Sequence, residues 1–171
     1  KIRDKVSILT YSWFMEARTL HAPLDVLSAA NRPQGIEIAT LTTFDIPALA
    51  VLTLEAYDNA VTPEALLETS EELRLTFEGA FGDTTEDSFV GAWDGGTLVG
   101  AILVVRESPW DDVPNGPFVV DLIVAPDYRR RGIATALVSE VASRCTHWGF
   151  DSLALRLDAR HGGARELYSM L

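Results

Sequence analysis

The sequence predicts an α/β fold of the α+β kind, built on a mixed and mostly antiparallel sheet with helices on both faces. Three observations lead to this. Two apolar runs, residues 88–93 and 97–106, flank Asp94-Gly95-Gly96, which is typical of a tight hairpin turn. Residues 118–158 alternate as strand, helix and strand, and such a crossover joins parallel strands. Two further helix patterns precede the hairpin.

We expect residues 1–34 to form an N-terminal arm or extension and residues 35–171 to form the main domain. Within the arm, residues 6–14 alternate weakly, as in a strand, and the leucine spacing of residues 15–30 is helical although Pro23 interrupts it. Turn-forming residues at positions 31–35 make a plausible linker.

The main domain opens with an apolar run at residues 36–41, which predicts a strand. Asp45 can cap the helix that follows. Thr62-Pro63-Glu64 is typical of a second helix start, because threonine caps, proline suits the first position and glutamate favours the positive end of the helix. This second helix is predicted to end at Gly79 or Gly82.

The second half of the domain contains the strand–helix–strand unit. Residues 118–124 form an apolar strand, a helix starts at Ile133, and Gly149 ends that helix. A strand over residues 151–158 follows, and a last helix is predicted from Gly162 or Gly163 to Leu171.

Composition excludes several classes of function. The 171 residues include 14 basic and 25 acidic side chains, a formal net charge of −11, which opposes general binding to nucleic acid or to an anionic membrane. One cysteine, Cys145, excludes an intrachain disulfide framework and a cysteine-clustered zinc site. We expect a cytoplasmic domain without a metal.

Three consecutive arginines, Arg129, Arg130 and Arg131, interrupt this acidic background and precede Gly132 at the predicted start of a helix. A helix N-terminus binds anions because its first N–H groups lack partners, and glycine lets a phosphate approach the backbone. The alternative is a solvated arginine loop in which the glycine serves only the turn.

The motif Arg129-Arg130-Arg131-Gly132-Ile133-Ala134, with its lead-in Val124-Ala125-Pro126-Asp127-Tyr128, resembles the acetyl-CoA signature of the GNAT N-acetyltransferase superfamily, Gln/Arg-x-x-Gly-x-Gly/Ala. Residues 164–168, Ala-Arg-Glu-Leu-Tyr, are similar to a second family motif. The resemblance covers about residues 35–171 and implies that the parallel strands splay apart.

The resemblance also implies where acetyl-CoA binds. Backbone amides from Arg129 to Thr135 would hold the pyrophosphate, and the strand before them would pair with the pantetheine arm. His161 stands where the family often has asparagine, so it either helps to hold the arm or is an ordinary loop histidine. The implied cofactor-binding residues are Leu122, Ile123, Val124, Arg129, Arg130, Arg131, Gly132, Ile133, Ala134, Thr135 and His161.

By the same resemblance, Tyr168 would protonate the departing thiolate, or else it only packs on the last helix. Asp121 is the carboxylate nearest to the place where some members carry a general base, so it would remove the proton of the amine. The alternative is a structural carboxylate that bonds to the local backbone. Cys145 is interpreted as a core residue. The resemblance implies that the loop before residue 118 helps to shape the acceptor cleft, where Glu107, Trp110, Asp111 and Asp112 suit a cationic amine. The alternative is a solvated acidic loop in an acidic protein.

The function expected is N-acetylation of a small-molecule or peptide primary amine by direct transfer in a ternary complex. The alternatives are a non-catalytic acyl-CoA-binding or regulatory module and an interaction domain without CoA. Family members continue into two further strands, so the domain is expected to lack its last strands at Leu171. Residues 6–14, or a strand swapped within a homodimer, are the candidate replacements.

Overall fold

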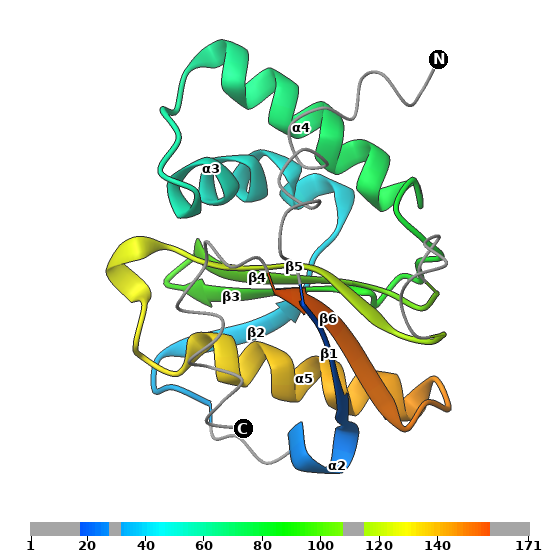
Figure 1. Cartoon of the computed structure of the whole chain (residues 1–171). Coiled ribbons are helices and arrows are strands. Elements are labelled where there is room, and N and C mark those ends of the chain that lie inside the picture. Colours follow the sequence, from blue (N-terminus) through cyan, green and yellow to red (C-terminus); the bar gives the residue numbers. More distant parts are fainter. Residues whose placement is uncertain (1–17, 28–31, 108–114, 158–171) are drawn as a thin grey trace.

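The structure is a computed structural model that describes residues 18–27, 32–107 and 115–157. Its described strands form one six-stranded sheet. Its strand order is β1-β6-β5-β4-β3-β2, and every neighbouring pair is antiparallel except β5 and β6. The predicted α+β class with one parallel pair is thereby confirmed (Figure 1). The strands are β1 (Arg18–Pro23), β2 (Ile36–Thr40), β3 (Phe89–Asp94), β4 (Thr97–Val105), β5 (Phe118–Val124) and β6 (Ser152–Leu157).

Helices cover both faces of the sheet (Figure 1). One face carries α3 (Ile46–Ala56) and α4 (Pro63–Phe77), and the other carries α5 (Ile133–His147) and the short α2 (Leu24–Leu27). Two 3-10 turns, η1 (Thr43–Asp45) and η2 (Pro126–Tyr128), lead into α3 and towards α5. In the described part of the chain, no helix combines the length and apolarity needed to cross a membrane.

The helix boundaries follow local signals. At the start of α4, the Thr62 hydroxyl accepts a hydrogen bond from the backbone N–H of Ala65 at 3.2 Å, and Pro63 occupies the first turn. At the end of α5, Gly149 has a φ of +89°, a conformation that suits glycine and ends a helix. The predicted ends of these helices are confirmed to within a few residues.

The N-terminal segment differs from its prediction. Residues 18–23 form the edge strand β1, antiparallel to β6 from Arg18↔Leu157 to Pro23↔Ser152, so the helix predicted over residues 15–30 is wrong there. Proline cannot continue a helix, whereas the open edge of β6 satisfies the backbone groups of an extended segment. The alternative strand over residues 6–14 lies outside the described residues.

Helix α2 fastens this segment to the core. Leu24 and Leu27 are each 3% exposed and belong to the apolar cluster between α5 and the sheet. The Leu24 backbone N–H also donates to the carbonyl of Asp151, just before β6, at 3.0 Å. Residues 18–27 are therefore part of the packed structure.

A polar network anchors the C-terminal end of α5. The Asp87 carboxylate accepts hydrogen bonds from the Thr85 hydroxyl at 2.6 Å and from Trp148 Nε1 at 3.2 Å. Arg144 Nη1 donates to the Asp87 carbonyl at 2.8 Å and to Thr40 Oγ1 at 2.9 Å. Burial opposes ionisation of Asp87, but the bonds from Thr85 and Trp148 and the charge of Arg144 outweigh it and lower its pKa.

We predict that Leu24→Ala lowers the free energy of unfolding by about 2–4 kcal/mol, because it removes a buried side chain and leaves a cavity against α5. Leu67→Ala, the same change at a side chain that is 75% exposed, should stay within about 0.5 kcal/mol of the parent. Denaturant unfolding measures both. Equal losses at the two positions would contradict the packing of residues 24–27 into the core.

Candidate functional site

Strands β5 and β6 begin as a parallel pair and then separate. They pair at two positions, Phe118↔Ala154 and Val119↔Leu155. On the other side of β5, the register with β4 shifts from Val104↔Val119 to Leu103↔Asp121, so that Val120 is an extra residue in the strand. Such a β-bulge bends its strand and increases the local twist. The separation of the parallel strands therefore coincides with the bulge.

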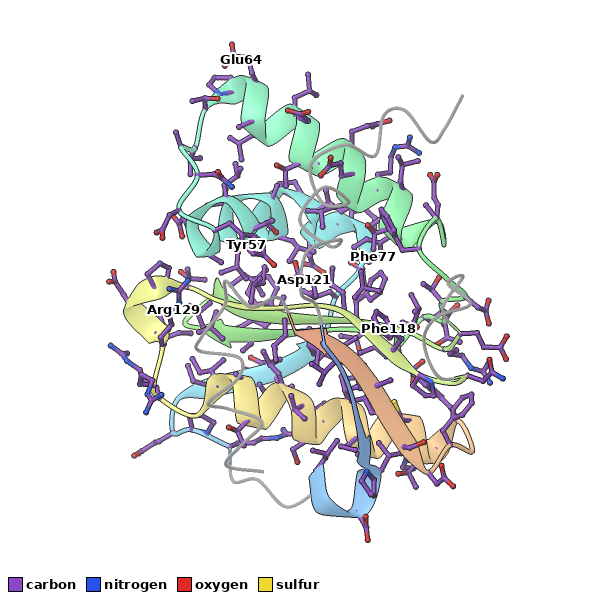
Figure 2. The ribbon with its side chains drawn as sticks, in the orientation of Figure 1. Tyr57, Glu64, Phe77, Phe118, Asp121 and Arg129 are labelled. Atoms are coloured by element: carbon purple, nitrogen blue, oxygen red, sulfur yellow. The ribbon has the colours of Figure 1, made fainter. Side chains whose placement is uncertain are left out.

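The bulge also changes the direction of side chains along β5. Val119 and Leu122 belong to the cluster on the α5 face, whereas Val120 packs into the cluster on the α3 face. Strict alternation would place Asp121 on the α5 face with Val119. Instead Asp121 also faces α3, where its Oδ1 accepts a hydrogen bond from the Tyr57 hydroxyl at 2.6 Å (Figure 2). The bulge thus places a half-buried carboxylate beside α3.

Beyond the bulge, β5 keeps its partner on one side only. Residues 122–124 pair with Ile102, Ala101 and Gly100 of β4. Towards β6, the backbone groups of these residues have no strand partner among the described residues. Polar backbone groups at such an edge can pair with an extended chain or ligand. The side chains of Leu122, Ile123 and Val124 pack against the two cores, and the backbone groups form the edge that faces β6.

The same strand leads to the N-terminus of α5. Gly132 is the N-cap residue, with a φ of +81° and no side chain to satisfy the first N–H groups of the helix. A Cβ atom built on Gly132 would come no closer than 3.8 Å to the protein, the nearest atom being in Pro33. The first turn of α5 therefore begins at an exposed glycine without a side-chain cap, the arrangement that favours an anion.

Another glycine fixes the position of this helix end. A Cβ atom on Gly100 of β4 would lie 2.8 Å from Cγ2 of Ile133 and 3.2 Å from Cδ1 of Leu137. The absence of a side chain at Gly100 thus lets α5 pack closely against the strand next to β5. Ile133 is 1% exposed, so its side chain belongs to the core and only its backbone could contact a ligand.

Arg129 and Arg131 of the arginine loop make different contacts with the protein. Arg129 Nη2 donates to the carbonyl of Ala56 at 2.7 Å, and its Nε donates to the carbonyl of Val124 at 3.2 Å. The guanidinium of Arg131 lies 4.8 Å from the centre of the Tyr128 ring. Arg129 therefore joins the loop to the ends of α3 and β5, while Arg131 stacks on the residue that precedes the arginines.

The loop is also fastened to the hairpin of β3 and β4. The Tyr128 hydroxyl donates to Oδ2 of Asp94 at 2.8 Å, and this bond is the main reason that the pKa of Tyr128 is raised. Arg130 takes a φ of +63°, which is uncommon for a residue with a side chain and bends the loop sharply. The exposed residues Arg129, Arg130, Arg131 and Gly132 thus form one short positive segment.

Some of the predicted site residues are brought together and others lie outside the described residues. Asp121 and residues 122–124 lie on β5, and the loop and helix start 129–135 follow directly after this strand and η2. Tyr168, His161 and residues 110–112 of the proposed acceptor loop lie outside the described residues. Their roles stay predictions.

Sequence reasoning did not identify Tyr57 as a candidate functional residue. Tyr57 and Asp121 are 64 positions apart, and no local pattern links them. The bulge at Val120 was also missed, because it depends on the hydrogen-bond register with β4.

The one cysteine does not belong to the site. Cys145 is fully buried on α5, and burial, with the nearby charge of Asp87, raises its pKa to about 12. Because the thiolate is the reactive form, a thiol in this environment does not act as a nucleophile at neutral pH. Within the described ranges, no group of three or more His, Cys, Asp or Glu side chains is placed to hold a metal ion.

Known proteins resemble this chain in sequence and in fold. The profile of the acetyltransferase (GNAT) family matches residues 52–171. A mycothiol acetyltransferase from Kocuria rhizophila is 34% identical over 100 residues, which is 53% of this chain and 32% of that protein. The match thus spans about a third of the length of this curated relative.

Solved structures share the fold. PH1933 from Pyrococcus horikoshii superposes with a TM-score of 0.66 at 16% identity, covering 79% of this chain and 86% of that one. The PaiA N-acetyltransferase from Thermoplasma acidophilum, solved in complex with coenzyme A, gives 0.60 at 19% identity, with 79% and 87% covered. At these identities the likeness concerns the fold alone.

We predict that Cys145 in the native protein reacts with a disulfide reagent such as Ellman's reagent only as fast as the protein opens, because the thiol is buried and neutral. In denaturant, the same thiol should react completely and at once. The absorbance of the released thiolate measures both rates. Complete labelling of the native protein within the mixing time would contradict the buried position.

Proposed function

Because the chain belongs to the acetyltransferase (GNAT) family, we propose that it transfers an acetyl group from acetyl-CoA to a primary amine, directly and in a ternary complex. One observation carries the proposal. Strand β5 separates from β6 at the Val120 bulge and leads from there to the uncapped N-terminus of α5. This arrangement offers backbone groups for an extended arm and donors for its phosphates.

The described residues fit acetyl-CoA in two respects. The pyrophosphate suits the backbone N–H groups of the segment from Arg129 to Thr135, where a Cβ atom on Gly132 would come no closer than 3.8 Å to its nearest neighbour, in Pro33. The pantetheine arm, a chain with two amides, suits the free backbone edge of residues 122–124. His161 is proposed to assist in holding this arm.

The chemistry requires two proton transfers. Acetyl-CoA, when bound, supplies the acetyl group as a thioester. Backbone N–H groups of β5 polarise its carbonyl, and Asp121 takes the proton that the amine loses, directly or through a water molecule. As the C–N bond forms and the C–S bond breaks, the Tyr168 phenol gives its proton to the departing sulfur. Nothing is transferred to the protein, so no nucleophilic side chain is needed.

The acceptor is proposed to be a primary amine of a small molecule or peptide. The 34% identical relative is named for mycothiol. Proteins of similar fold are named for ribosomal-protein alanine, from Brucella melitensis, and for aminoglycosides, from a soil metagenome. Since one scaffold serves acceptors of such different size, a screen for the acceptor should include amino sugars, aminoglycosides and peptide N-termini.

We predict that Gly132→Leu raises the Kd for acetyl-CoA about tenfold or more, because the new side chain would occupy the space next to the N–H donors. Gly149→Leu, at the other end of α5, is the matched control: Gly149 has a similar positive φ and nothing within 4 Å of a built Cβ. Both variants should lose about 1 kcal/mol of stability from backbone strain.

Isothermal titration calorimetry measures these affinities. No binding by the parent protein at hundreds of micromolar acetyl-CoA would overturn the proposed function. Equal affinities in the parent and in both variants would overturn the assignment of the loop.

We predict that Tyr168→Phe lowers kcat about a hundredfold or more, with the Kd for CoA unchanged. The variant keeps the aromatic ring and loses only the hydroxyl group that donates the proton. Release of CoA thiol over the amine panel measures kcat, and the buried Cys145 does not interfere. An unchanged kcat would exclude Tyr168 as the acid. If the parent protein binds CoA tightly but releases no CoA thiol with any amine, the result would favour the non-catalytic acyl-CoA-binding module.

A further inference from the structure

The C-terminal turn of α3 contacts both parts of the proposed site. Tyr57 follows the last residue of the helix and binds the carboxylate of Asp121 through its hydroxyl at 2.6 Å. Its neighbour Ala56 accepts a hydrogen bond from Arg129 of the loop at 2.7 Å. Two consecutive residues therefore link the proposed base to the proposed phosphate loop (Figure 2).

The bond to Asp121 has the geometry of a strong interaction. A phenol that donates to a carboxylate at this distance makes a charge-assisted hydrogen bond, stronger than one between neutral groups. Both side chains are half-buried, so water competes less for them than at an open surface. The bond holds the Asp121 carboxylate in one orientation and draws it towards α3.

The position of Tyr57 is fixed in turn by the backbone. Its N–H donates to the carbonyl of Thr53 at 3.2 Å, which continues the helical pattern by one residue. Helix α3 rests on the sheet through Leu49 and Leu52, which are 0% and 1% exposed. Arg129 adds a second tie, since it bridges the carbonyls of Ala56 and Val124, one at the end of α3 and one at the end of β5.

From these contacts we propose that Tyr57 is a positioning residue for the acyl transfer, which holds Asp121 for proton removal. We further propose that Arg129 sets the position of Tyr57 by clamping the turn of α3 to the end of β5. This inference rests on the proposed function. It assigns a task to the first arginine of the loop that is different from direct contact with phosphate.

The test compares Tyr57→Phe, Asp121→Asn and the double variant in the thiol-release assay, with calorimetry of acetyl-CoA binding. We expect Tyr57→Phe to lower kcat about tenfold or more while the Kd for acetyl-CoA stays within about twofold, since only the carboxylate loses a donor. In the Asp121→Asn background the same change should have little further effect on kcat, because Tyr57 acts through the carboxylate. A purely structural tyrosine would instead give additive losses.

Tyr128→Phe is the matched control, because it deletes another tyrosine–aspartate bond, to Asp94 at 2.8 Å, at the loop. It should raise the Kd for acetyl-CoA, and its effect on kcat should add to that of Asp121→Asn. Arg129→Lys keeps the charge and loses the two-point contact, so it should lower kcat and make the effect of Tyr57→Phe smaller.

The outcomes distinguish the positioning role of Tyr57 from the proposed function. An active parent enzyme with an unchanged Tyr57→Phe variant, or additive losses in the double variant, would overturn the positioning role alone. Failure of the parent protein to bind acetyl-CoA or to acetylate any amine would overturn the proposed function, and this inference with it.

Discussion

The bulge at Val120 is the feature on which the rest of the site depends. One extra residue in β5 turns Asp121 towards α3 rather than α5, and it lies at the point where the pairing with β6 ends after two positions. A continuous parallel pair would leave no free backbone edge at residues 122–124, and an unbulged strand would point Asp121 away from Tyr57. The change of register thus sets the direction of the carboxylate at the same place where β5 and β6 separate.

The surrounding structure positions the N-terminus of α5 relative to the sheet. Gly100 lets α5 approach β4, while the network of Asp87, Arg144 and Trp148 anchors the opposite end of the helix. The arginine loop precedes the N-terminal end of α5, and Arg129 and Tyr128 use their hydrogen bonds on the protein itself. In a chain of formal net charge −11, the loop is a local region of positive charge where an anionic ligand is favoured electrostatically.

The sequence predicted those parts of the fold that carry local signals. Thr62-Pro63, Gly95-Gly96, Gly132 and Gly149 each mark a boundary through their own backbone preferences, and the strand–helix–strand unit follows from the spacing of apolar residues. Strand β1 was not predicted, because the edge of β6, rather than its own leucine spacing, makes residues 18–23 extended. The bulge and the contact between Tyr57 and Asp121 depend on pairings distant in sequence, which no local pattern encodes. Tyr168 and His161 came from family resemblance and lie outside the described residues.

A crystal structure of the protein with acetyl-CoA tests the central claim most directly. The account predicts that the pyrophosphate oxygens lie within hydrogen-bond distance of the backbone N–H groups of residues 132–135, and that the pantetheine arm runs along residues 122–124 of β5 in the opening beside β6. The thioester should then lie on the side of Asp121. Acetyl-CoA bound elsewhere on the molecule, or β5 and β6 paired continuously past Val120, would contradict it.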